Sequence, residues 1–154
     1  MDLVRELTVP ASADRVFAYV ADLDEYPAWM PLIAEVDRIA DEAPGGGSTD
    51  APAWSVVLQA QVGPFTRSKR LRMIRTAHVD GERAVFERDE VDGRDHAMWR
   101  LDSEIESIDA AQCRLRMSLH YGGRLWGGPV LERVLDAQIA EASVNLLGLV
   151  SAPG

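Results

Sequence analysis

Several features that define other protein classes are scarce or missing in this chain of 154 residues. It has one cysteine, Cys113, and three histidines, so an internal disulfide is excluded and no zinc-binding spacing occurs. It has no run of about 18 apolar residues that could cross a bilayer, and no basic start with an apolar run behind it. We therefore expect a soluble, cytoplasmic protein without a metal, a cofactor or integral membrane contact.

Positive charge is also in short supply. Lysine and arginine number 16 against 25 aspartates and glutamates, which leaves a formal net charge of −9 at pH 7. This balance disfavours nucleic acid as a main partner, because the phosphate backbone is repelled. The composition is that of an ordinary globular protein, with 47% hydrophobic residues. The length suits one domain over residues 1–154. A monomer and a homodimer are both compatible with it.

The longest predicted element is a helix over Pro129–Val150. Proline suits the first helical position, and the apolar residues that follow recur at helical spacing. They form one stripe, made of Leu131, Val134, Leu135, Ile139, Ala142, Leu146 and Leu149. Two amides, Gln138 and Asn145, project among these positions. They either offer hydrogen bonds to a ligand or bond to backbone and water at the edge of the stripe.

Most of the preceding chain alternates apolar and polar residues, as strands do. Strands are predicted at Leu3–Val9 and then at 33–39, 54–62, 65–76, 83–91, 96–108 and 113–121. A short helix capped by Ser12 and a helical turn after Asp22 follow the first strand. Asp80–Gly81 and Asp92–Gly93 are two-residue hairpin signals, whereas 41–52 is a glycine-rich loop. The fold class is α+β: an antiparallel sheet of six to seven strands against the long helix.

Two segments resemble a known superfamily. Residues 9–31, VPASADRVFAYVADLDEYPAWMP, are similar to the opening of START-type proteins of the SRPBCC superfamily, particularly bacterial polyketide cyclase/dehydrase-like members. Residues 62–73, VGPFTRSKRLRM, resemble their middle strands. The resemblance implies a helix-grip fold, in which a curved sheet wraps around the long C-terminal helix. It also implies a cavity between helix and sheet that holds a polyketide, a lipid or an isoprenoid-like molecule.

The predicted ligand-binding set combines inward strand positions, helix positions and two tryptophans at the expected cavity entrance. It comprises Trp29, Trp54, Leu58, Phe86, Arg88, Trp99, Leu101, Ser103, Met117, Leu119, Tyr121, Trp126, Leu135, Gln138, Ala142 and Asn145. The tryptophans either stack on a flat ligand or pack in the core. A binding protein is the leading hypothesis. The resemblance also allows a cofactor-independent cyclase, aromatase or dehydratase, or a coenzyme-Q-binding-like partner protein with an apolar surface around Trp29.

Candidates for catalysis come from polar residues expected to face inward. A two-residue turn at Asp92–Gly93 pairs Phe86 with Trp99 and Arg88 with Ala97, so Arg88 and Glu90 point into the sheet's concave side. Two interpretations stay open for this pair. It orients a polar group of the ligand or transfers a proton to it, or it is a structural ion pair.

Tyr121 and Ser103 end the inward rows and present a similar choice. Their hydroxyls either donate to a ligand carbonyl or satisfy backbone groups.

One strand concentrates positive charge. It carries Arg67, Lys69, Arg70, Arg72 and Arg75 without an acid among them. Two interpretations stay open for this strand. It binds an anion, a coenzyme-bearing substrate or a carrier protein, or it is neutralised by Glu87, Asp89 and Glu90 of a neighbouring strand.

Overall fold

The computed structural model describes residues 2–39, 52–62, 64–90, 97–122 and 128–151. Its elements follow the predicted order of strand, short helices, strands and long helix. They are β1 (Asp2–Val9), α1 (Ala13–Val20), the 3₁₀ helix η1 (Leu23–Ala28), β2 (Ile33–Ile39), β3 (Ala53–Val62), β4 (Phe65–Val79), β5 (Arg83–Arg88), β6 (Trp99–Asp109), β7 (Gln112–Tyr121) and α2 (Gly128–Ser151). Most of the predicted loop 41–52 lies outside the described residues.

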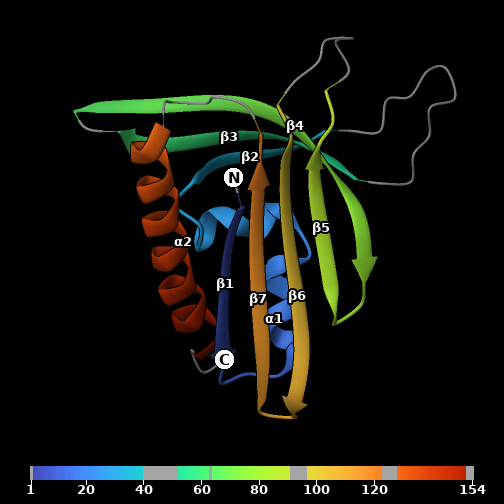
Figure 1. Ribbon diagram of the computed structural model, residues 1–154. Helices are drawn as coiled ribbons and strands as arrows, with labels where there is room; N and C mark the ends of the chain where they lie inside the picture. Colours follow the sequence, from blue (N-terminus) through green and yellow to red (C-terminus); the bar gives the residue numbers. More distant parts are fainter. Residues whose placement is uncertain (1, 40–51, 63, 91–96, 123–127, 152–154) are drawn as a thin grey trace, which may run out of the picture.

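Seven strands form one antiparallel sheet in the order β1-β7-β6-β5-β4-β3-β2. The sheet curves strongly, so α2 contacts both β1 at one edge and β3 near the other (Figure 1). Apolar faces of the strands and of α2 meet inside this curve. The prediction of a helix-grip fold is confirmed.

The short helices begin where their sequences predict. Ser12 Oγ accepts a hydrogen bond from the backbone N–H of Arg15 at 3.3 Å, and Asp14 lies in the first turn of α1. Val16 and Val20 turn into the core. The cap expected from the side chain of Asp22 is not formed, although η1 starts directly after it.

Strands β6 and β7 carry the inward rows that alternation predicts. Their buried side chains are Trp99, Leu101, Ser103, Ile105, Cys113, Leu115, Met117, Leu119 and Tyr121. On the outer face, Glu104 pairs with Arg116 and Glu106 with Arg114. The pairing of β6 with β7 thus brings buried residues together on the inner face and opposite charges together on the outer face.

The predicted ends of β5 are wrong in two respects. Its first turn has three residues, Asp80–Glu82, with Gly81 at a φ of 73°, which glycine adopts without strain. The strand does not reach Val91: it ends at Arg88, and the ten residues 89–98 separate it from β6. This longer connection shifts the register, so that Phe86 pairs with Leu101 instead of Trp99. The Asp92–Gly93 turn lies outside the described residues.

Candidate functional site

A small enclosed space lies between α2 and the concave face of the sheet. Its walls are almost entirely apolar and come from η1 and the segment after it, from five strands and from α2. They include Leu23, Met30, Leu32, Ile33, Val56, Leu58, Leu71, Met73, Trp99, Leu101, Leu119 and Ile139. The cavity volume is about 20 Å³, which is room for about one water molecule. Side chains therefore fill most of the space that the fold encloses.

Only part of the predicted ligand-binding set borders this cavity. Leu58, Trp99, Leu101 and Leu119 do so. Other predicted members are buried in the same core without lining it, namely Trp54, Phe86, Ser103, Met117, Tyr121, Leu135 and Ala142. Trp126 lies outside the described residues.

Sequence reasoning missed several lining residues on β4 and after η1. Leu71 and Met73 of β4 pair with Val56 and Trp54 of β3, and residues directly opposite share a face. Extending the alternation of β3 across the hairpin would have identified both. Met30 lacks such a signal, since it lies in an irregular segment.

Aromatic rings pack densely around the cavity. Trp99 and Tyr121 are paired across β6 and β7, and their rings stack with centroids 5.3 Å apart and planes 22° apart. The rings of Trp54 and Tyr26 pack edge-on against the ring of Phe86, with centroids 5.5 and 5.7 Å from its centroid. Such contacts stabilise the core beyond the area that they bury. For Trp54 these contacts match the expectation of core packing.

Three buried polar atoms on the concave side have no hydrogen-bond partner within the described part of the chain. They are Trp54 Nε1, Trp99 Nε1 and Gln138 Oε1. An unpaired buried donor or acceptor typically costs about 1–3 kcal/mol, so native structures contain few of them. Trp99 also borders the cavity, although the surface that lines the cavity is apolar.

Tyr26 is fully buried in the same core. Its hydroxyl donates to the backbone oxygen of Val20 at 2.9 Å. Burial raises the pKa of the Tyr26 phenol well above its ordinary value, against a smaller lowering by the neighbouring hydroxyl of Ser103. Tyr26 is therefore a neutral structural donor at physiological pH.

Asn145, the second amide of α2, already has a hydrogen-bond partner within the protein. Asn145 donates from Nδ2 to the backbone oxygen of Trp29 at 3.2 Å, which is the structural alternative for this residue. Trp29 is itself buried, and its indole N–H donates to the oxygen of Tyr19 at 3.1 Å. The ring of Trp29 therefore packs inward and is not part of the apolar surface that the coenzyme-Q-binding-like alternative expects around it.

Arg88 and Glu90 lie close together at the end of β5. Arg88 pairs with Met73 across the sheet and points inward, with 6% of its side chain exposed. Its Nε donates to Glu90 Oε1 at 2.9 Å, and Nη1 donates to the backbone oxygen of Ala97 at 3.2 Å. Glu90 Oε1 also accepts from the backbone N–H of Arg72 at 3.1 Å. The pair thus ties the end of β5 to β4 and to the start of β6.

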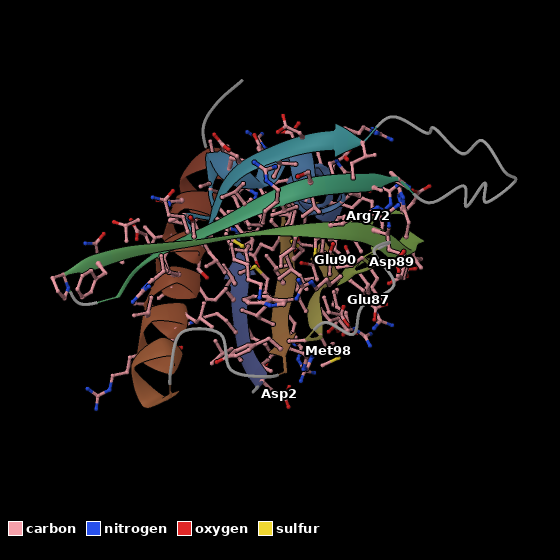
Figure 2. The ribbon with its side chains drawn as sticks, turned by 90° about the horizontal axis from the view of Figure 1, so that it is seen from above. Asp2, Arg72, Glu87, Asp89, Glu90 and Met98 are labelled. Carbon is pink, nitrogen blue, oxygen red and sulfur yellow. The ribbon has the colours of Figure 1, made fainter. Side chains whose placement is uncertain are left out.

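Neutralisation of the basic strand β4 is partial. Arg72 forms an ion pair with Asp89 at 3.0 Å, and Figure 2 shows Arg72, Asp89 and Glu90 at the same end of the sheet. The side chains of two other arginines on this strand contact uncharged groups. Arg70 donates to Ser55 Oγ at 2.6 Å, and Arg75 donates to the backbone oxygen of Ala21 at 2.7 Å.

No group of three or more histidine, cysteine, aspartate or glutamate side chains is placed to hold a metal ion in the described ranges. None of the described helices is long and apolar enough to span a bilayer.

The sequence from residue 2 to residue 148 matches the family described as polyketide cyclase / dehydrase and lipid transport, and the chain belongs to this family. Among curated proteins, none matches the sequence significantly. Several solved structures share the fold. A START superfamily protein from Mycobacterium smegmatis is 18% identical with a TM-score of 0.69, covering 97% of this chain and 96% of that one.

Two further structures carry functional names. Zhui aromatase/cyclase from Streptomyces sp. R1128 is 17% identical with a TM-score of 0.68, covering 97% of this chain and 93% of that one. Human StAR-related lipid transfer protein 5 is 12% identical with a TM-score of 0.70, covering 97% and 74%. At these identities the likeness establishes the fold.

Proposed function

We propose that this protein binds an apolar or aromatic small molecule between α2 and the concave face of the sheet. The observation that carries the proposal is the enclosed apolar cavity, whose walls come from seven separate elements and the segment after η1. Sites for small molecules are typically concave and apolar with a few polar groups. Membership of a family described by polyketide cyclisation and lipid transport supports the same conclusion.

The cavity must enlarge to accept such a ligand. Pockets for small molecules usually measure about 300–1,000 Å³, far more than the roughly 20 Å³ enclosed here. Met30 and Met73 line the space, and unbranched methionine side chains repack more readily than branched ones. Polar links that hold α2 are few among the described residues, namely Arg5–Asp136 at 3.3 Å and Asn145–Trp29. Apolar contacts that α2 loses on opening are replaced by contacts to the ligand.

The unpaired polar atoms indicate the ligand's chemistry. Trp99 Nε1 is a buried donor of a residue that lines the cavity, and Gln138 Oε1 is a buried acceptor on α2. A largely apolar molecule that carries a carbonyl or hydroxyl oxygen would satisfy the indole N–H. Such pairing recovers the cost of the buried unpaired groups.

Catalysis of the cyclase type is the second candidate function. Its support is the position of Tyr121 against Trp99 and of Arg88 beside Met73, since both neighbours line the cavity. Arg88 donates to Glu90, so the role of Arg88 would be to orient a substrate carbonyl through its guanidinium and not to exchange protons. Tyr121→Phe should then abolish turnover of a candidate polyketide with little change in melting temperature, whereas Arg88→Met should lower both, because it leaves Glu90 without its partner. Undiminished turnover would remove both residues from a mechanism.

A fluorescence titration tests binding directly. The neutral probe N-phenyl-1-naphthylamine should bind the native protein with a stoichiometry of one. Leu101→Trp fills the cavity and should weaken the probe's affinity by at least about tenfold, because overpacking opposes the opening. Ile108→Trp is the matched control on the same strand, where the side chain is 47% exposed. Equal affinities for all three proteins would contradict the proposal, provided that their near-ultraviolet spectra show a native core.

A further inference from the structure

Charge is strongly segregated in this chain. From Ala53 to Val79, the whole span of the β3–β4 hairpin, the sequence contains no aspartate or glutamate. The same span carries all five cations of the basic strand, in a protein whose net charge is −9. Only Arg72 among them forms an ion pair with an acid of the described residues. The hairpin is therefore a locally cationic element of an acidic protein.

An exposed aromatic side chain lies at the tip of this hairpin. Phe65 is 60% exposed, and the guanidinium of Arg67 lies 5.5 Å from the centroid of its ring. Lys69, two residues further, has no hydrogen-bond or ion-pair partner in the part of the chain that the structure describes. The tip thus combines an apolar ring with cations that are not neutralised.

The hairpin reaches past α2 and away from the remainder of the sheet (Figures 1 and 2). In physiological salt, charge interactions are screened over about 8 Å, so the charges nearest the tip decide its attraction for an anionic surface.

We propose that the tip of the β3–β4 hairpin docks on an anionic lipid surface. Phe65 inserts at the level of the headgroups, and Arg67 and Lys69 contact lipid phosphates. Interfacial binding requires an apolar side chain and neighbouring cations, and both are present at the tip. A specific protein interface buries about 800 Å² on each partner around a packed apolar centre, whereas the tip offers a single exposed aromatic ring.

Docking in this way has a consequence for the cavity. Across the hairpin, Lys69 pairs with Leu58 and Arg67 pairs with Ala60. The side chains of both cations therefore lie on the concave face of β4. Leu71, the next residue of that row, lines the cavity. The membrane-bound hairpin therefore places the bilayer at the end of the row of side chains that leads into the cavity.

Sedimentation with lipid vesicles tests the proposal. The protein should bind vesicles of equimolar phosphatidylcholine and phosphatidylglycerol, and bind pure phosphatidylcholine weakly. Each cation near such a surface contributes about fivefold in affinity, so Arg67→Gln/Lys69→Gln should bind about 25-fold more weakly. Phe65→Ser should lose about tenfold, because it removes the inserted ring. Raising the salt concentration should weaken binding of the wild type more than that of the double variant.

Matched controls separate the tip from general charge and hydrophobicity. Arg133→Gln removes an exposed cation from α2, and Ile108→Ser removes an exposed apolar side chain from β6. Both should bind as the wild type does. Failure of the wild type to prefer anionic vesicles would overturn the proposal and leave an acidic protein as the partner to seek. Equal binding by the tip variants and the controls would also overturn it. Neither outcome bears on binding of a small molecule in the cavity.

Discussion

Asn145 on α2 donates a hydrogen bond to the backbone oxygen of Trp29, 3.2 Å away and 116 residues earlier in the chain. This contact joins the long helix to the segment that follows α1 and η1. Trp29 is buried, so its carbonyl has little access to water. The bond therefore fixes the position of α2 at one end of the cavity.

Replacing this amide should destabilise the protein. Asn145→Leu leaves the carbonyl of Trp29 unpaired in the core and should lower the free energy of unfolding by about 1–3 kcal/mol. Urea unfolding measures the change. Val144→Ala, at a neighbouring residue that is 68% exposed, is the control and should change stability by less than about 0.5 kcal/mol. Equal stabilities of the two variants would show that the bond contributes nothing.

The cavity walls should be sensitive to truncation. Leu119→Ala removes a buried side chain that lines the space and should cost about 2–5 kcal/mol. A hydrophobic ligand that fills the enlarged cavity should restore part of this loss, which thermal unfolding with and without the naphthylamine probe measures. The surface variant Ile108→Ala should lose little stability and gain nothing from the probe. A large loss without rescue would argue against an accessible site.

Stability above pH 10 should depend on Tyr26. Its folded pKa is raised by burial, so the neutral phenol contributes stability that is present below the unfolded pKa of about 10. As the pH rises beyond that value, the unfolded chain ionises and the folded one does not, and stability falls by up to about 1.4 kcal/mol per pH unit. Denaturant titrations between pH 9 and 11 should show this slope reduced in Tyr26→Phe. An unchanged slope would mean that Tyr26 ionises in the folded protein.

Asp102 should matter more than other acids of the outer face. Its carboxylate is only 12% exposed and accepts from Arg83 at 2.7 Å, with Arg100 at 3.4 Å. That ion pair also raises the pKa of Arg83. Asp102→Asn should cost about 1–3 kcal/mol, because two guanidinium groups lose their shared anion.

The control for Asp102 is Glu106→Gln. Glu106 makes a 3.7 Å pair with Arg114 in full contact with solvent, and such pairs contribute about 0–1 kcal/mol. Urea unfolding should therefore separate the two variants clearly. Similar losses in both would indicate that net charge, and not the buried contact, decides the effect.

Local periodicity explains which parts of the fold were predictable. The inward rows of β6 and β7 and the stripe of α2 follow from spacings of 2 and 3.6 residues, and Ser12 caps α1 through a contact three residues away. The register of β5 on β6 did not follow, because it depends on a connection whose length the hairpin signal at Asp92–Gly93 did not reveal.

The site was less predictable than the fold for a physical reason. Whether Asn145 faces a ligand or a backbone group depends on where Trp29 lies, and 116 residues separate the two. The volume left between helix and sheet likewise depends on how side chains such as Met30 and Met73 pack. Neither the partner of Asn145 nor the volume of the cavity can be inferred from the spacing of residues in the sequence.

The central claim is that the apolar space between α2 and the sheet binds a hydrophobic molecule. Native mass spectrometry of the protein isolated from its own host tests it most directly. The wild type should carry a small-molecule adduct of defined mass, and Leu101→Trp, prepared in the same way, should not. Spectra without an adduct for the wild type, or with the same adduct on both proteins, would contradict the claim.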